Sequence, residues 1–266
     1  MKILFYLSQI RQIQPTQIVM SSTEETTGSV NYPAQFLNVG LSFVTVVLCG
    51  ANLLQYEELL IIGKLTSITL YLLVASEVAR WFMNKYSVGL EPKVKKGFQF
   101  TTTSRAAPKV SPVIQNITEV IKVSGLLSGF TLLYAVVCIL MGAPSQSNYE
   151  GTLVLSAILT ALTILPVCLY LGFTWAFRCL YNDFVELTMR AEALHLEFLH
   201  YNAIGTLIGA WSGSVVVPLD WDREWQVYPI PNIVGALVGF AAANIYTLAN
   251  SLYSYSRQVI RKNKLL

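Results

Sequence analysis

Acidic and aromatic side chains are concentrated in one short stretch of this chain, Asp220-Trp221-Asp222-Arg223-Glu224-Trp225. Two carboxylates two residues apart, with a third nearby, could bind a divalent cation or act as general acid and base. A hard cation needs several oxygen ligands, and phosphoryl-transfer sites usually add His or further Asp residues, which this stretch lacks. No Ser, Thr or Cys stands beside a base in the pattern of an activated nucleophile. The sequence therefore predicts no catalytic residue, no metal ligand and no cofactor here, and favours a structural cap.

Apolar segments with regularly spaced small residues flank the acidic stretch on both sides. The small residues recur every four positions, at Gly205, Gly209, Gly213, Gly235, Gly239 and Ala243. This spacing presents a groove into which another helix backbone can fit closely. We therefore expect a hairpin of two helices, turned by Pro218 and by the Pro-Ile-Pro at 229–231, with a packing surface along the glycine faces.

The composition indicates that lipid is the solvent of most of the chain. Of 266 residues, 54% are hydrophobic and only 12% are charged, about half the charged fraction of a soluble domain. The net charge of +3 is too small to indicate a nucleic-acid partner. Six segments approach or exceed the roughly 20 residues that cross a bilayer as a helix. They lie at about 34–54, 59–82, 116–141, 151–174, 199–219 and 230–253.

The fold class that follows is an all-α polytopic membrane protein with six transmembrane helices. With both termini cytosolic, 16 of the 18 Lys and Arg residues face the cytosol, which satisfies the positive-inside rule. This orientation puts the acidic stretch and its tryptophans in the lumen, at the depth that aromatic side chains favour. We expect a loose tail at 1–33, a membrane domain at 34–253 and a basic tail at 254–266.

Three further groups of charged residues have positions or spacings that indicate a role. Lys64 lies about a turn inside the second predicted span, where it can extend to the headgroups or contact a lipid phosphate. Glu77 and Arg80 are three residues apart and can pair on one helix face. Lys262 and Lys264 have the spacing of the dilysine retrieval signal of endoplasmic-reticulum membrane proteins, which must face the cytosol.

A transporter would require discontinuous helices in matching halves of the chain. Pro166 in the fourth predicted span and Pro218 near the end of the fifth could break helices. We find no internal repeat, and ionisable residues are scarce in the middle of the spans, so the sequence does not favour this class.

The acidic stretch and its surroundings carry a family resemblance. Gly209-Ala210-Trp211-Ser212-Gly213, then Pro218-Leu219-Asp220-Trp221-Asp222-Arg223 and Trp225-Gln226, are followed by Tyr228-Pro229-Ile230. This pattern resembles the signature of the class F (PIG-F) family of glycosylphosphatidylinositol (GPI) biosynthesis. A tyrosine stands at 228 where the family pattern has tryptophan, which keeps an aromatic ring at the interface.

The resemblance implies a non-catalytic, multi-pass subunit of the endoplasmic-reticulum membrane. Such a subunit binds and stabilises the large transferases that move ethanolamine phosphate from phosphatidylethanolamine to mannose of the GPI precursor. We expect the fifth and sixth spans to dock that partner, or alternatively to pack on each other. The expected partner-binding residues are Gly205, Gly209, Trp211, Gly213, Pro218, Asp220, Trp221, Asp222, Arg223, Trp225, Gly235 and Gly239. The alternative function is a lipid-handling protein, in which Lys64 and the cap hold a lipid phosphate.

Overall fold

A computed structural model describes residues 32–88, 112–144, 148–181, 190–219 and 222–264, and no strand occurs among them. The helices are α3 (Tyr32–Leu53), α4 (Tyr56–Ile61), α5 (Ile68–Met83), α6 (Pro112–Leu140), α7 (Tyr149–Thr163), α8 (Leu165–Tyr181), α9 (Arg190–Gly213) and α10 (Ile230–Lys264). Shorter turns are η1 (Asn84–Val88, π-helical), η3 (Ser214–Val216) and η4 (Glu224–Gln226), the last two 3₁₀-helical. The all-α prediction is thereby confirmed for the described residues.

The apolar stretch predicted as a second span, 59–82, is divided by a turn at 62–67 into α4 and α5. Ser67 begins α5, because its hydroxyl accepts a hydrogen bond from the Thr69 N–H at 3.3 Å and so satisfies one unpaired helical donor. Lys64 is consequently an exposed turn residue. Its expected position a turn inside a continuous helix is wrong, because the helix is interrupted there.

The fourth predicted span also bends, at the place where the sequence indicates a break. Helix α7 ends at Thr163, α8 begins at Leu165, and their axes differ by 50° over Tyr149–Phe173. Pro166 explains the break, because proline has no N–H to donate and its ring collides with the carbonyl four residues earlier.

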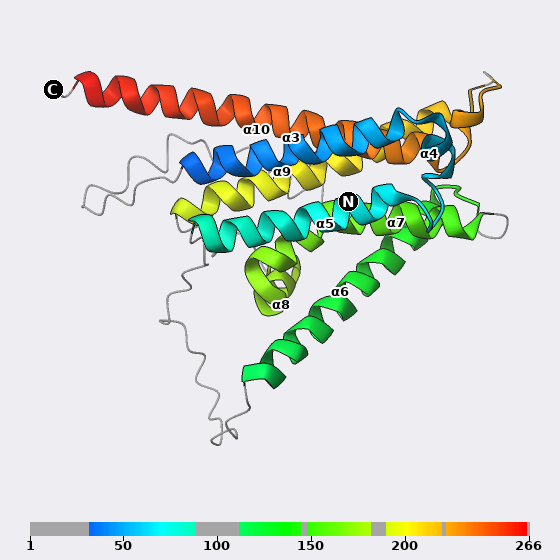
Figure 1. Cartoon of the computed structure of the whole chain (residues 1–266), viewed down its shortest axis with the longest axis horizontal. Coiled ribbons are helices and arrows are strands. Elements are labelled where there is room, and N and C mark those ends of the chain that lie inside the picture. The colour runs from blue at the N-terminus through cyan, green and yellow to red at the C-terminus, as the bar shows by residue number, and fades with distance from the viewer. Residues whose placement is uncertain (1–31, 89–111, 145–147, 182–189, 220–221, 265–266) are drawn as a thin grey trace. The chain divides into compact units, whose positions relative to one another are not determined.

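Helices α9 and α10 run antiparallel along much of their length (Figure 1). The chain between them, 214–229, forms the cap, which contains η3 and η4. At the same end lie the 62–67 turn and the start of α7, because Leu65 N–H donates to Glu150 at 2.9 Å and Asn148 donates to the Tyr228 carbonyl at 3.0 Å. The opposite ends of α5 and α9 therefore lie away from the cap.

Length and hydropathy identify three helices that can cross a membrane, within α3 (Gln35–Leu53), α6 (Ile117–Leu140) and α10 (Ile230–Ile260). The bent α7–α8 pair makes four if it counts as one span. The remaining two predicted spans are not confirmed as continuous apolar helices. One is the divided 59–82 segment. The other falls in α9, which ends at Gly213 and begins with several charged residues.

Two buried clusters hold the bundle together. The larger joins α3, the 62–67 turn, α5, α7, α9 and α10 through side chains such as Ile62, Leu73, Ile158 and Phe240. The smaller joins α3, α8 and α9 through Val39, Tyr170 and Phe198, among others. The remaining faces of the predicted spans carry exposed apolar side chains, as lipid-facing surfaces do.

Candidate functional site

The glycine faces of α9 and α10 pack directly against each other, and we call this contact the glycine seam. A Cβ at Gly205 would lie 2.6 Å from the Gly239 carbonyl oxygen and 2.7 Å from the Ala243 Cβ. A Cβ at Gly209 would collide with the Gly235 carbonyl oxygen, and one at Gly213 with that of Pro231. Only glycine allows the two backbones to approach so closely. The small-residue spacing thus builds the hairpin itself.

An apolar groove of about 770 Å³ runs along one side of the glycine seam. Its lining extends from Tyr201 and Tyr246 at one end to Leu59 and Trp225 at the cap end. The seam glycines line it, together with larger side chains such as Ile208 and Val238, which are exposed. A long apolar groove with small residues along its length can accept a helix or an acyl chain.

Gln226 organises the interior of the cap. Its side-chain Nε2 donates to the Val216 carbonyl at 2.8 Å and also to the Leu219 carbonyl, and the side chain is buried. Asp222 has a φ of 48°, a left-handed conformation that Asp adopts more readily than most residues. The side chains of Asp222, Arg223 and Glu224 are exposed. The described charged side chains of the cap therefore face outward, and the Gln226 amide faces inward.

Tyr228 and Pro229 attach the cap to the rest of the bundle. The Tyr228 hydroxyl donates to Thr152 Oγ1 at 3.1 Å. Burial raises the pKa of this phenol to about 12, so it remains a protonated donor at neutral pH. The Pro229 ring lies against Gly63 and Gly151, where an added Cβ would lie 2.8 Å and 2.9 Å from its Cδ. These contacts fix the entry of the chain into α10.

Tyr228→Phe should lower the free energy of unfolding by about 1 kcal/mol, since it removes one hydrogen bond and keeps the ring. The corresponding fall in melting temperature is roughly 2–4 °C for a chain of this size. Thermal unfolding of the purified protein in one detergent measures it. Tyr149→Phe is the control, because Tyr149 is exposed beside the same helix start, and it should change nothing. Equal shifts would show that the Tyr228–Thr152 bond does not stabilise the cap.

The predicted site residues do not all come together. The five glycines form the seam, and Trp225 reaches the end of the groove, while Trp211 and Pro218 are exposed outside it. Asp220 and Trp221 lie outside the described residues, so their predicted roles remain predictions. Lys262 and Lys264 end α10, and their side chains are not described.

Several residues that hold the cap were not among the predicted ones. Asn148 caps α7 by accepting from the Gly151 N–H at 3.2 Å and also donates to the cap. An Asn shortly before an apolar run is a recognisable N-cap signal. Its second role, and those of Thr152 and Gly63, depend on contacts between segments far apart in sequence. The spacing of residues along the sequence does not reveal such contacts.

The predicted Glu77–Arg80 ion pair is confirmed, with Oε2 and Nη1 3.1 Å apart. Both side chains are buried in a polar region at the end of α5 away from the cap. No group of three or more His, Cys, Asp or Glu side chains with metal-binding geometry occurs in the part of the chain that the structure describes.

Comparisons with known proteins agree with the motif. Residues 58–248 match the family model described as GPI biosynthesis protein family Pig-F. The Yarrowia lipolytica protein named glycosylphosphatidylinositol anchor biosynthesis protein 11 is 31% identical over 46% of this chain and 52% of its own. The human protein named GPI ethanolamine phosphate transferase, stabilizing subunit, is 31% identical over 44% of this chain and 51% of its own. An Aspergillus fumigatus protein, which has the same name as the Yarrowia protein, is 47% identical over 19% of this chain and 17% of its own.

The chain spans about half the length of several of these curated relatives. No solved structure matches it. The family match nevertheless covers the cap, the seam and most of the described helices, which is well over half of the chain. This membrane protein therefore belongs to the GPI biosynthesis protein family Pig-F.

Proposed function

We propose that this chain is a non-catalytic membrane subunit that binds and stabilises a GPI ethanolamine phosphate transferase in the endoplasmic reticulum. In that complex the transferase moves ethanolamine phosphate from phosphatidylethanolamine to a mannose of the GPI-anchor precursor. The observation that carries the proposal is the long groove beside the glycine seam, in a family with a human member named as a stabilizing subunit. The chain supplies a surface for helix packing, and the large subunit supplies the chemistry.

We also propose six spans across residues 34–253, with the tails 1–33 and 254–266 in the cytosol. The distribution of Lys and Arg supports this orientation. It places the cap in the lumen, beside the 62–67 turn and the start of α7. Two of the six spans are then irregular. The second is kinked and consists of α4, the turn and α5, and the fifth consists of α9 and the start of the cap.

The proposed occupant of the groove is a transmembrane helix of the transferase. Individual helix–helix contacts in a membrane contribute only about 0.6–2 kcal/mol, so a stable complex needs a long continuous surface. The groove provides one from Tyr201 to Trp225, along the C-terminal half of α9 and into the cap. At its cap end, the exposed Asp222 and Arg223 can pair with lumenal residues of the partner.

Filling the groove should disrupt the complex without unfolding the chain. Val238 lines the groove and is 63% exposed, so Val238→Trp adds bulk without displacing buried atoms of the chain. We expect recovery of the transferase with the tagged chain to fall at least tenfold, since the loss of about 1.4 kcal/mol suffices for that. Co-purification in mild detergent, followed by mass spectrometry, measures it.

The matched control is Val136→Trp on α6. Val136 is 52% exposed on another predicted span and does not line the groove. This variant should recover the transferase as the unchanged chain does. If Val238→Trp folds normally and recovers the transferase undiminished, the partner does not occupy the groove. If the unchanged chain recovers no transferase at all, the proposed function itself fails.

A further inference from the structure

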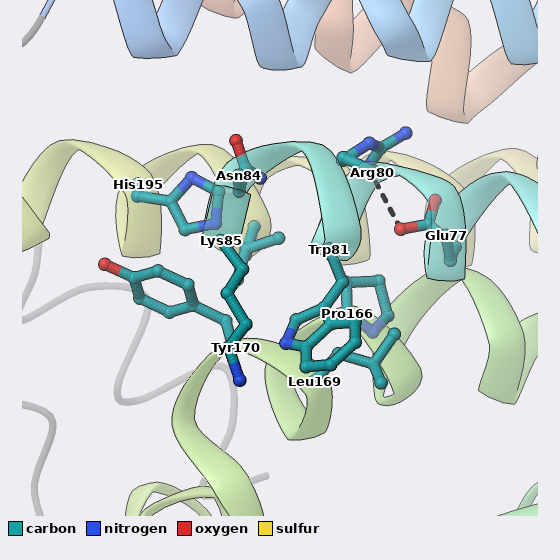
Figure 2. A pocket seen from close by; sticks show the side chains of 10 residues that line it. Glu77, Arg80, Trp81, Asn84, Lys85, Pro166, Leu169, Tyr170 and His195 are labelled. Atoms are coloured by element: carbon teal, nitrogen blue, oxygen red, sulfur yellow. Dashed lines mark ion pairs between the residues drawn. The ribbon is translucent and has the colours of Figure 1, made fainter. Parts of the chain in front are cut away.

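A second, polar pocket of about 330 Å³ lies at the end of the bundle away from the cap. It is enclosed by the end of α5 with η1, by α8 and by α9. Figure 2 shows Glu77 and Arg80 on one side of this pocket, His195 and Tyr170 on the other, and the side chain of Lys85 between them. The pocket therefore gathers two cations and one carboxylate from a single helix end.

Among these groups, Arg80 has the largest number of hydrogen-bond donors without an acceptor. It is 4% exposed, yet its Nε and Nη2 have no hydrogen-bond acceptor in the described part of the chain, and Nη1 has only an ion-pair contact that lacks the geometry of a hydrogen bond. Its only anionic neighbour in that part is Glu77, whose Oε2 is 3.1 Å from Nη1 and whose Oε1 is likewise without a donor. A guanidinium carries five donors. Each buried donor that is left unsatisfied has lost its hydration without a replacement, which is unfavourable.

The surrounding polar groups do not accept hydrogen bonds from Arg80. Asn84 donates to Asn38 Oδ1 at 2.6 Å, and the Asn38 amide lies 3.5 Å from His195 Nδ1. The two aromatic neighbours of Arg80, Phe198 and Phe240, lie 5.8 Å and 6.0 Å from its guanidinium carbon and offer only ring faces. No polar group among the described residues thus accepts a hydrogen bond from Arg80.

We propose that this pocket binds a phosphate group. A phosphate presents several anionic oxygens, which the planar guanidinium fork of arginine matches in geometry. Lys85 adds a second positive charge from the pocket lining, where its Nζ lies 5.2 Å from the centre of the Trp81 ring. Among the described residues that line the pocket, two cations exceed the charge of Glu77 by one, which favours an anion.

The source that the lining favours is the headgroup of a membrane phospholipid. Trp81, Pro166 and Leu169 line the same pocket and can contact the carbons next to a lipid phosphate. The nitrogens of Arg80 are shielded in the present conformation, so binding requires a rotation about its outer side-chain torsions toward the cavity. A free phosphate ion has the same chemistry, and experiment distinguishes the two sources.

The test uses the full-length chain in detergent with two lipids that differ only in phosphate, dioleoyl phosphatidic acid and dioleoylglycerol. Native mass spectrometry should show at least tenfold tighter retention of the phosphatidic acid. Lys85→Gln should reduce that retention about tenfold, the effect of losing one hydrogen bond to a charged group. Lys85 is exposed, so this variant is expected to fold.

Lys122→Gln is the matched control, because Lys122 is also exposed and also lies over an aromatic ring, 5.9 Å from the centre of Phe173. It should retain phosphatidic acid as the unchanged chain does. If inorganic phosphate alone raises the melting temperature of the unchanged chain and not of Lys85→Gln, without a preference between the lipids, the ligand is soluble phosphate. Equal retention of both lipids, with no response to phosphate, would overturn the proposal and leave a cavity filled by water.

Discussion

A Gly209→Leu variant should yield almost no folded protein. A Cβ at this position collides with the Gly235 carbonyl oxygen and lies 2.9 Å from the Gly239 Cα. Both obstacles are backbone atoms of α10, so no rotamer change can relieve them, and the helices must separate along the seam. Overpacking of a well-packed interior costs about 1–3 kcal/mol and occasionally more. Here the lost contacts of the whole seam add to that cost.

Gly129→Leu supplies the control for this experiment. Gly129 lies in α6, and a Cβ there would meet nothing within 4 Å. Both substitutions replace a helical glycine, so both gain about the same helix propensity, on the order of 0.8–1 kcal/mol. Size-exclusion chromatography of fluorescent fusions should show a monodisperse peak for Gly129→Leu and its loss for Gly209→Leu. Equal recovery of the two would mean that α9 and α10 are not in contact along their glycines.

Glu77→Leu should destabilise the chain by about 3–5 kcal/mol, because it leaves the buried charge of Arg80 without its carboxylate. Adding Arg80→Met should restore most of the loss, since replacing a whole buried ion pair by apolar side chains is often neutral or stabilising. Thermal unfolding of the two variants in the same detergent measures the recovery. The double variant should also lose the proposed preference for phosphatidic acid while remaining folded, which separates the structural role of Arg80 from its binding role.

The pair Glu119–Lys122 on α6 is the control for the buried pair. It has the same three-residue spacing and a similar distance of 3.2 Å, but both side chains are about half exposed. Exposed pairs contribute about 0–1 kcal/mol, so Glu119→Leu should have little effect. A small effect at Glu77, as at Glu119, would show that water reaches the Arg80 charge in the folded chain.

Sequence reasoning identified the helical hairpin of α9 and α10 because four-residue spacing of glycines has a direct geometric meaning. It could not decide between its two expected occupants of the glycine faces. Spacing shows that a backbone can approach, whereas the identity of that backbone depends on the pairing of the two segments. The structure pairs them with each other and leaves the groove at their side for the proposed partner.

Of the two helix interruptions, the sequence predicted the one at Pro166 and missed the one at 62–67. Pro166 acts through its own covalent geometry, so the break between α7 and α8 could be expected from one residue. The turn at 62–67 depends on the side-chain cap of Ser67 and on Pro229 packing against Gly63. The apolar residues on either side outweigh Gly63, Lys64, Thr66 and Ser67 when hydropathy is averaged over a span, so the two helices were predicted as one.

The Glu77–Arg80 pair was predictable because its two members lie on one helix face. The pocket around the pair was not predictable, since it also includes Leu169 and His195. These two residues belong to helices about a hundred residues further along the chain than Glu77 and Arg80. Their approach results from the bend at Pro166 and from the packing of α9 on α10. Apart from that pair, the polar residues of the lining could therefore be seen in the sequence only as isolated positions.

The glycine seam also limits how the family can change over time. When two side chains touch, growth of one can be accommodated by shrinkage of the other, and such positions vary together. At Gly209 and Gly213 the opposing atoms all belong to the main chain, which every amino acid carries. No substitution in α10 can make room for a larger residue at these two positions in α9. Methods that infer contacts from correlated substitutions should accordingly give little signal for this closest helix contact, and the seam should be recognised by invariance alone.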